Sequence, residues 1–283
     1  MICLITNKNK RSDKLIETIC RFLKKQKYEY KIIDAYPFQK KDKKNANRAE
    51  LLIIIGGDGT ILTALSQFDF QKEVKIIPIH FGRLGFISSI PSARALALIK
   101  NYLNNNRRQF KNETRPLLEI TTGDKTYYAL NEAVITKKKP GRLISLEAYF
   151  SKFKAVSFRA DGVILATATG STAYNLSADG PILHPQVEAV VFNPVCPHSL
   201  TLKPLVIPGH AQTTIKISPD NTQTPEMILD GNISVSLKPG QSVHSSLCSK
   251  KITFIKPAGE NFYATIKTKL HWGKDNTFNK IKF

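Results

Sequence analysis

The chain has 283 residues, of which 42% are hydrophobic, enough to bury a sizeable core in one large domain or two modest ones. Its apolar runs are far shorter than the roughly 20 residues that a membrane-spanning helix needs, and no basic segment precedes an apolar one at the N-terminus. The four cysteines are widely scattered without C-x-x-C spacing, which argues against a disulfide framework and a thiolate zinc site. We therefore expect a cytoplasmic protein that is neither secreted nor inserted in a membrane.

The formal net charge of +20 would attract nucleic acid, anionic lipid or a small molecule that carries several phosphates. Lysines far outnumber arginines, and the basic runs at 40–44 and 137–139 lack interleaved aromatic residues. They also lack the planar arginine groups that read base edges. We interpret most of this charge as a solvated surface that can also attract an anionic substrate, and we do not expect nucleic acid as a partner.

The first part of the chain alternates predicted strands with predicted helices. An amphipathic helix is expected over 12–27 and a shorter one over about 60–67. The apolar face of the first helix consists of Leu15, Ile16, Ile19, Phe22 and Leu23. The predicted strands are 1–6, 30–35, 51–55 and 74–81. Such alternation favours parallel βα units in an open sheet, which we assign to an α/β domain over 1–105.

The pattern changes after Asn106 to short strand-like runs separated by Gly, Pro and Asn. These runs cover 117–123, 126–136, 143–158, 213–219 and 233–240. Short alternating runs with turn residues between them are typical of antiparallel sheets. We therefore predict a β-rich second domain over 106–265.

The sequence GGDGT (56–60) directly follows the apolar run 51–55. In open α/β sheets, ligands bind just outside the carboxyl ends of strands, and glycines there let a ligand approach the backbone. The following helix start offers unpaired amide groups that suit phosphate, so Gly56, Gly57, Gly59 and Thr60 are candidate phosphate-binding residues. Asp58 could accept a proton from an attacking hydroxyl, or it could merely cap the helix. The motif alone leaves both interpretations open.

A second informative stretch, FRADGVILATATGSTAYNLSADGPILHP, covers 158–185. Asp161 precedes an apolar run, and hydroxyl groups then crowd into eleven residues. They belong to Thr167, Thr169, Ser171, Thr172, Tyr174 and Ser177. Hydroxyls beside small residues suit recognition of amide and base edges, whereas a plain helix cap needs only one of them.

GGDGT (56–60), GRLGFIS (82–88), LNEAV (130–134) and RADGVILATATGSTAYNLSADGP (159–181), in this order, resemble the NAD kinase family. CPHSL (196–200) and KTKLHW (267–272) extend the resemblance to nearly the whole chain. GGDGT alone is similar to motifs of phosphofructokinases and lipid kinases, but the block ATGSTAYNLSADGP (168–181), with the preceding pair Asn131 and Glu132, is specific. Two departures are Asp179, where glycine is expected, and Lys203, where the family often has arginine.

The resemblance implies transfer of a phosphoryl group from ATP or polyphosphate to the adenosine 2′-hydroxyl of NAD, with Asp58 as general base. It implies a divalent ion, which we expect to be Mg²⁺, bound with the donor's phosphates and not in an all-protein metal site. Residues 266–283 are expected to pack back on the first domain, and we expect a homo-oligomer, either a dimer or a tetramer. Alternatives are another GGDGT-type kinase acting on a lipid or a sugar, and a basic nucleic-acid-binding protein.

By the same resemblance, Asp58, Gly59, Asn131 and Glu132 are expected to bind the adenosine and ribose groups of NAD. Arg142 and Arg159 would line the site as positive groups, and Asn232 is a further candidate. The segment expected to hold the adenine and the nicotinamide amide comprises Asp161, Thr169, Thr172, Ala173, Tyr174, Asn175, Leu176 and Ser177.

Overall fold

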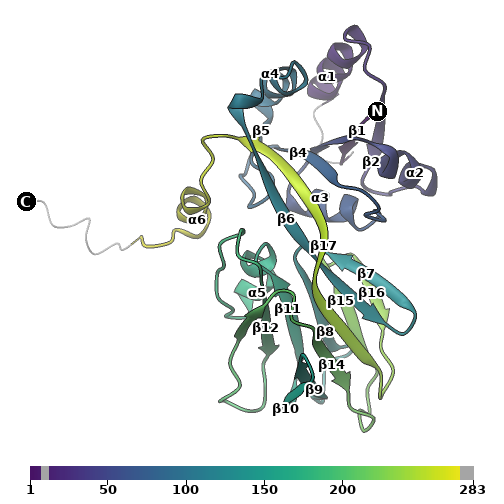
Figure 1. Ribbon diagram of the computed structural model, residues 1–283, viewed down its shortest axis with the longest axis vertical. Coiled ribbons are helices and arrows are strands. Elements are labelled where there is room, and N and C mark those ends of the chain that lie inside the picture. The colour runs from purple at the N-terminus through teal and green to yellow at the C-terminus, as the bar shows by residue number, and fades with distance from the viewer. Residues whose placement is uncertain (8–12, 275–283) are drawn as a thin grey trace, which may run out of the picture. The chain divides into compact units, whose positions relative to one another are not determined.

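The computed structural model describes residues 1–7 and 13–274, and the chain divides into two units (Figure 1). Unit 1 contains Met1–Ala64, Val74–Glu113 and Thr253–Phe283, and unit 2 contains Leu65–Glu73 and Thr114–Ile252. The sequence placed the division at 105 and the return at 266, whereas these units divide after Glu113 and return at Thr253. Residues 275–283 of the expected returning segment lie outside the described residues, as does Ser12 of the expected first helix.

Unit 1 is built on a parallel sheet with the strand order β2-β1-β3-β4 and with β5 also paired with β4. The strands are β1 (Ile2–Thr6), β2 (Tyr30–Asp34), β3 (Leu51–Ile55), β4 (Val74–His80) and β5 (Ile90–Pro91). β1 and β3 are buried at every position, as expected for strands covered on both faces. The open parallel sheet predicted from the sequence is confirmed.

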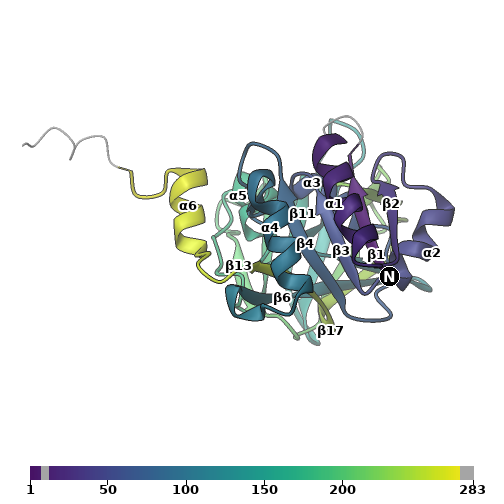
Figure 2. The same cartoon turned by 90° about the horizontal axis from the view of Figure 1, so that it is seen from above.

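Helices cover both faces of this sheet. They are α1 (Asp13–Lys25), α2 (Lys40–Arg48), α3 (Asp58–Leu65) and α4 (Ser92–Leu103), and unit 1 also contains α6 (Phe262–Leu270). α1 and α4 lie side by side (Figure 2) and bury apolar side chains with alternate residues of β1 and β3 in one cluster. The Cys3 Sγ donates to the Asn45 carbonyl at 3.6 Å, so α2 lies against the opposite face. No helix in the described part of the chain is long and apolar enough to span a membrane.

Two long strands, β6 (Phe110–Thr122) and β17 (Ser242–Pro257), begin in one unit and end in the other. Their portions in unit 1 are joined by an ion pair of 2.9 Å between Lys256 Nζ and Glu113 Oε1. Both side chains are largely buried. Breaking a buried ion pair leaves an uncompensated charge, so this pair resists separation of the two strands.

Unit 2 consists of antiparallel strands, which confirms the β-rich second domain. One sheet has the order β13-β12-β11-β8-β15-β16; in the other, β10-β9-β14-β17 are neighbours and β6 pairs with β7. The first six are β8 (Glu132–Lys137), β11 (Gly162–Thr167), β12 (Ala189–Val195), β13 (Leu205–Pro208), β15 (Pro225–Leu229) and β16 (Ile233–Ser236). The others are β7 (Lys125–Ala129), β9 (Ile144–Phe150), β10 (Phe153–Ala160) and β14 (Thr213–Ile217).

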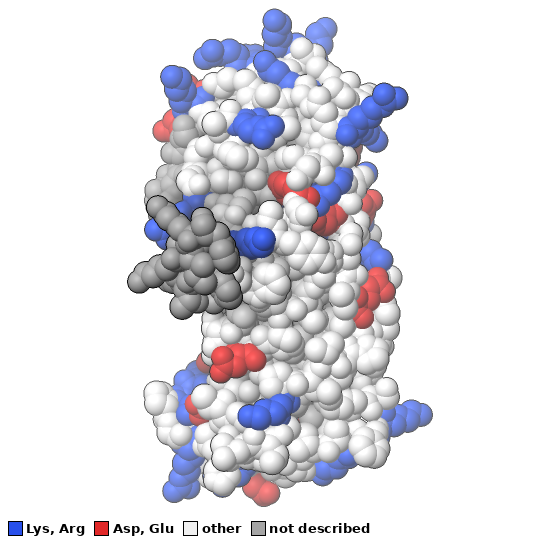
Figure 3. Space-filling view, turned by 90° about the vertical axis from the view of Figure 1, so that its left-hand side faces the viewer, with Lys and Arg blue, Asp and Glu red and all other residues white. Residues whose placement is uncertain are grey.

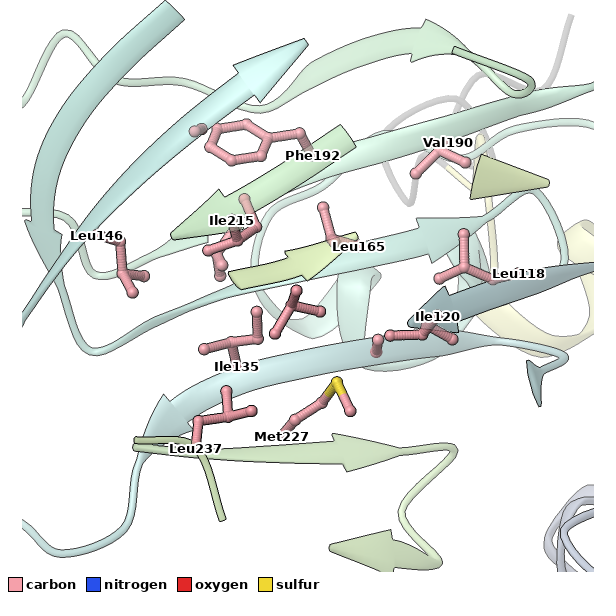
Figure 4. Close-up of a cluster of buried hydrophobic side chains, with 14 of the residues drawn as sticks. Leu118, Ile120, Ile135, Leu146, Leu165, Val190, Phe192, Ile215, Met227 and Leu237 are labelled. Atoms are coloured by element: carbon pink, nitrogen blue, oxygen red, sulfur yellow. The ribbon is translucent and has the colours of Figure 1, made fainter. Parts of the chain in front are cut away.

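Alternate residues of these strands point inward and form one apolar core (Figure 4). Phe192 of β12 is central to it, with its ring edge-on to Phe150 and Phe158 at 5.4 and 5.8 Å between centroids. Three short helices complete the elements: the 3-10 helices η2 (Arg107–Gln109) and η3 (Gly170–Thr172), and α5 (Tyr174–Ser177). η3 and α5 follow directly after β11, so the rigid core positions the hydroxyl-rich turn at its edge.

Candidate functional site

The glycine-rich turn begins where the buried strand β3 ends. Gly56 extends the ladder by donating its amide to the Ile79 carbonyl of β4 at 2.8 Å. A Cβ atom at Gly56 would collide with the side chain of Thr60, so only glycine allows the chain to turn this tightly into α3. α3 begins at Asp58, two residues earlier than predicted, which places Asp58 in the first helical turn.

The Asp58 carboxylate is fixed by the loop 85–88. Oδ2 accepts the Phe86 amide at 2.8 Å, while Oδ1 accepts the amides of Ile87 and Ser88 at 3.2 and 2.8 Å and the Ser88 hydroxyl at 2.7 Å. A Cβ at Gly85 would collide with the carboxylate, so glycine is required for this approach. None of the bonds that the carboxylate accepts from described residues comes from α3. The side chain is therefore held by the loop and does not cap its own helix.

This arrangement leaves the Asp58 carboxylate chemically available. Oδ1 has three donors, whereas Oδ2 has one and keeps a lone pair that can accept a proton. Asp58 is half-buried, and its neighbours Gly57 and Gly59 are exposed without side chains to block access. The amides of Asp58 and Gly59 lie too early in α3 to bond a carbonyl of the same helix and can bind an anion beside the carboxylate, whereas the Thr60 amide donates to the Gly57 carbonyl at 2.9 Å.

Two further groups lie close to Asp58 in unit 1. His80, the last residue of β4, follows the Ile79 that bonds Gly56, and its side chain is buried. Burial lowers the pKa of His80; the nearby Asp58 carboxylate acts to raise it, and the Lys269 cation lowers it further. The Lys269 Nζ lies 4.6 Å from the centroid of the Phe86 ring. Phe86 thus contacts Lys269 with its ring and Asp58 with its amide.

In unit 2, a second carboxylate orders the pair Asn131 and Glu132. Asp230 accepts three consecutive amides, from Leu130 at 2.7 Å, Asn131 at 2.8 Å and Glu132 at 3.0 Å. Burial raises the pKa of Asp230 to about 6 although these three hydrogen bonds act to lower it. Asp230 itself has a φ of 47°, in the left-handed region that an acidic side chain tolerates better than most.

The Asn131 and Glu132 side chains carry polar atoms that are ready for a ligand. Both residues are buried, and Asn131 Oδ1 and Glu132 Oε2 have no hydrogen-bond partner among the described residues. Burial, and secondarily the charge of Asp230, raises the pKa of Glu132 to about 8. Buried polar groups in native proteins are nearly always satisfied, so these two oxygens are candidates for hydrogen bonds with a ligand.

Asp161 and Arg159 occupy neighbouring positions with different surroundings. Asp161, which lies between β10 and β11, forms an ion pair with Lys137 Nζ. Arg159 is exposed on β10 and lines a cavity of ≈ 490 Å³ together with His198 and Ser199. Arg142 is also exposed, so the two arginines are accessible to an anion.

The hydroxyl-rich turn after β11 is divided between internal and accessible groups. Thr167 Oγ1 donates to the Leu130 carbonyl at 2.6 Å and accepts the Gly170 amide at 3.1 Å. Arg115 Nη1 donates to Thr169 Oγ1 at 3.3 Å. Asn175 is fully buried; its amide donates to the Ser171 and Pro181 carbonyls, and its oxygen accepts from Asn193. These groups shape the turn.

Other members of the turn are open to solvent. Tyr174 and Ser177 are exposed, whereas Thr172, Ala173 and Leu176 are half-buried. Tyr174, Ser177 and Lys203 line a cavity of ≈ 660 Å³. Asp179, where glycine was expected, has a φ of 57°, which explains why glycine suits this position. Asn232 is exposed and donates to the Asp230 carbonyl at 2.7 Å.

The structure therefore places the expected residues in two groups. Gly56, Gly57, Asp58, Gly59 and Thr60 lie in unit 1, and all the other expected residues lie in unit 2. The described residues contain no cluster of three or more His, Cys, Asp or Glu side chains that could hold a metal ion.

Sequence reasoning assigned no role to Ser88, Asp230 and Lys137. Ser88 is the last residue of the GRLGFIS stretch, and Asp230 lies two residues before Asn232. Both could have been predicted as site residues from their positions in or beside these motifs. Lys137 was interpreted as part of a solvated run, yet it pairs with Asp161. No one-dimensional signal distinguishes it from Lys138 and Lys139.

A carboxylate held among glycines at the carboxyl end of a buried parallel strand, with a β-rich unit beside it in sequence, fits an α/β phosphotransferase. Family models agree. Residues 7–107 match the "ATP-NAD kinase N-terminal domain" and residues 130–257 match the "ATP-NAD kinase C-terminal domain". The chain belongs to the NAD kinase family.

Individual relatives agree with this assignment. The chain is 38% identical over 232 residues to an NAD kinase of Coxiella burnetii (strain Dugway 5J108-111), covering 80% of this chain and 76% of that protein. An NAD kinase of Ectopseudomonas mendocina (strain ymp) is 38% identical over 230 residues, with 79% and 76% coverage.

Two solved structures share the fold. Yeast NADH kinase complexed with NADH matches with a TM-score of 0.84 and 23% identity, covering 97% of this chain and 88% of that one. An NAD kinase from Archaeoglobus fulgidus in complex with ATP has a TM-score of 0.78 and 22% identity, covering 96% and 99%.

Proposed function

We propose that the chain phosphorylates the adenosine 2′-hydroxyl of NAD to give NADP, with ATP or polyphosphate as donor and Asp58 as general base. The observation that carries this proposal is the Asp58 carboxylate, held by four donors from the loop 86–88 with one lone pair of Oδ2 left over. These hydrogen bonds fix the orientation of the base and leave one lone pair accessible to a proton. It agrees with the family and with its relatives, which are named NAD kinases.

The proposed reaction is a single displacement. The ribose O–H gives its proton to Asp58 Oδ2, and its oxygen forms a bond to the terminal phosphorus of the donor. The bond between that phosphorus and the bridging oxygen breaks, so ADP or a shortened polyphosphate leaves with the electron pair. A ribose hydroxyl is a weak nucleophile at neutral pH, and a positioned base typically contributes about 10²–10⁴-fold.

The donor's charge is neutralised in two ways in this proposal. Backbone amides of Gly57 and Gly59 at the start of α3 face the phosphates, and Mg²⁺ arrives with the donor and binds its phosphates. The net charge of +20 favours approach of an anionic donor. On the face shown in Figure 3, Lys and Arg side chains are dispersed among uncharged residues, so we assign the charge to long-range attraction.

NAD is held, in this proposal, mainly by unit 2. The unpartnered oxygens of Asn131 and Glu132 receive hydrogen bonds from ribose hydroxyls or the adenine amino group. Asp161, with Lys137 as its partner, accepts from the nicotinamide amide. Thr169, Thr172, Ala173, Tyr174, Leu176, Ser177 and Asn232 line the ligand, Asn175 shapes the turn, and Arg142 and Arg159 attract its phosphates. We also propose a cytoplasmic homo-oligomer, either a dimer or a tetramer.

The experiment is direct. Purified protein is incubated with Mg²⁺ and NAD together with ATP or polyphosphate in turn, and NADP is measured by a dehydrogenase that accepts only NADP. We expect NADP with at least one donor and none without donor. Absence of NADP with both donors, from protein that melts cooperatively, would refute the proposal.

A further inference from the structure

We infer that Lys269 and His80 form a binding subsite for the donor's terminal phosphates beside Asp58. This inference rests on the proposed function, because it assigns the polyphosphate substrate to specific groups of the same site. All three residues belong to unit 1. The reasons are a charge that needs compensation, a cation with no anionic partner among the described residues, and a buried imidazole with no hydrogen bond to any of them.

The first reason is electrostatic. A donor with several negative phosphates has to approach the negative Asp58 carboxylate, which repels it. Helix amides contribute only partial charges, and a divalent ion that arrives with the donor offsets only part of the charge of several phosphates. A full positive charge fixed on the protein at this place would offset the repulsion and stabilise the transferred group.

Lys269 provides such a charge. It lies in the last turn of α6, is exposed, and makes no ion pair with any described residue. Its position is set by the Phe86 ring at 4.6 Å, and the amide of the same Phe86 bonds Asp58 at 2.8 Å. Phe86 therefore contacts both the proposed base, Asp58, and the cation of Lys269. Because no carboxylate in the described part of the chain pairs with Lys269, its ammonium group can contact an anionic ligand without losing a salt bridge to that part.

His80 provides the second, independent observation. It is only 6% exposed, and neither ring nitrogen has a hydrogen-bond partner among the described residues. Leaving a buried donor and acceptor unsatisfied lowers stability, and a purely structural position would avoid this loss with an apolar residue. Gly56, in the glycine-rich turn, bonds the Ile79 carbonyl directly before His80. A neutral imidazole at this point can donate its N–H to a phosphate oxygen.

Lys267 offers a matched control for Lys269. Both lysines are exposed in the last turn of α6, but only Lys269 contacts Phe86 among the described residues. In Lys269→Met, the flexible apolar chain keeps contact with the Phe86 ring while the charge is lost. Lys269→Arg keeps both the charge and the ring contact.

The experiment titrates Mg²⁺-ATP, tripolyphosphate and NAD into wild type, Lys269→Met, Lys269→Arg, Lys267→Met and His80→Leu by calorimetry. We expect Lys269→Met to weaken ATP and tripolyphosphate by about tenfold, as loss of one charge-assisted contact does. NAD affinity should stay unchanged, and Lys269→Arg and Lys267→Met should bind like wild type. His80→Leu should weaken both donors while its melting temperature stays equal or rises.

Wild-type affinity for both phosphate ligands in Lys269→Met or in His80→Leu would overturn the assignment of that residue. An equal loss in Lys267→Met would also overturn it, because it would show a general charge effect. The titrations need no turnover. A wild type that binds ATP and forms no NADP would therefore refute the proposed function, while the role of Lys269 is still decided by the titrations.

Discussion

Asp58 in unit 1 and Asp230 in unit 2 are held in the same way, since each accepts three consecutive backbone amides. Their surroundings differ. Asp58 lies between exposed glycines and has a fourth donor in the Ser88 hydroxyl, whereas the amides bound by Asp230 belong to the segment that carries Asn131 and Glu132. We call such a carboxylate with its three consecutive amides a clamp. In unit 1 the clamp fixes a candidate reacting group. In unit 2 it fixes the backbone that carries candidate ligand-binding groups.

The variants Asp58→Asn and Asp230→Asn should show the largest difference between the two carboxylates. We expect Asp58→Asn to lower kcat by about 10²-fold or more, because an amide cannot accept the proton. The clamp is affected too, since either orientation of the amide turns its NH₂ group toward at least one donor of the loop. NADP formation and NAD affinity are measured side by side, with the exposed Asp124→Asn as control. Wild-type turnover in a folded Asp58→Asn protein would contradict the role of the base.

Asp230→Asn should have the opposite profile. Its NH₂ group would face at least one of the three amides, so about 1–3 kcal/mol of stability should be lost, which corresponds to roughly 2–4 °C in Tm per kcal/mol. The KM for NAD should rise more than kcat falls, because the segment with Asn131 and Glu132 loosens. The exposed Asp220→Asn serves as control. A fall in kcat as large as that of Asp58→Asn would erase the distinction between the two clamps.

The buried carboxyl group of Glu132 gives a further test, because it should make stability depend on pH. Burial, with a smaller contribution from Asp230, raises its pKa from 4.5 to about 8, so between these values the folded chain holds a proton that the unfolded chain releases. The free energy of unfolding therefore falls as pH rises through this window. Glu132→Gln removes the titration, so its Tm should gain on that of wild type from pH 5 to pH 8, while NAD affinity drops.

The measurement is a set of thermal melts at pH 5, 6.5 and 8 for wild type, Glu132→Gln and the exposed Glu29→Gln. The control should follow wild type at each pH. A constant difference between Glu132→Gln and wild type across the range would show that the carboxyl does not titrate as its burial implies.

The sequence predicted the parallel sheet because β1, β3 and β4 are nearly unbroken apolar runs, and apolar runs followed by turn residues have few alternatives. It missed α2, which buries only Ala46 and otherwise reads as a solvated lysine run. It also missed α4, whose buried face consists of only Ala95, Leu98 and Ile99. Short helices of this kind are stabilised by the sheet they cover, so their signal is tertiary.

The candidate site divides similarly. Motifs identified Asp58 and the pair of Asn131 and Glu132, because unusual residue types at fixed spacing are visible in one dimension. The partners of these residues were not visible. Asp230 meets Asn131 from 99 positions away, and Ser88 meets Asp58 from 30 positions away. Which polar residues meet depends on strand order, and strand order is set by the whole core.

We expect the smallest effect from a variant that leaves Asp58 with three amide donors, the same number as Asp230. Ser88→Ala removes the fourth donor of Asp58 and leaves three amides, as at Asp230. The Ser88 side chain is fully buried, and one hydrogen bond to a charged group contributes about 1.5–3 kcal/mol at most. Because the amides still orient the carboxylate, we expect kcat to fall by less than about tenfold and the Tm by a few degrees. Ser89→Ala, one residue along, is the control, and steady-state kinetics with thermal melts is the measurement. If Ser88→Ala were as damaging as Asp58→Asn, three amides would be insufficient to hold a catalytic carboxylate, and the resemblance between the clamps would be geometric only.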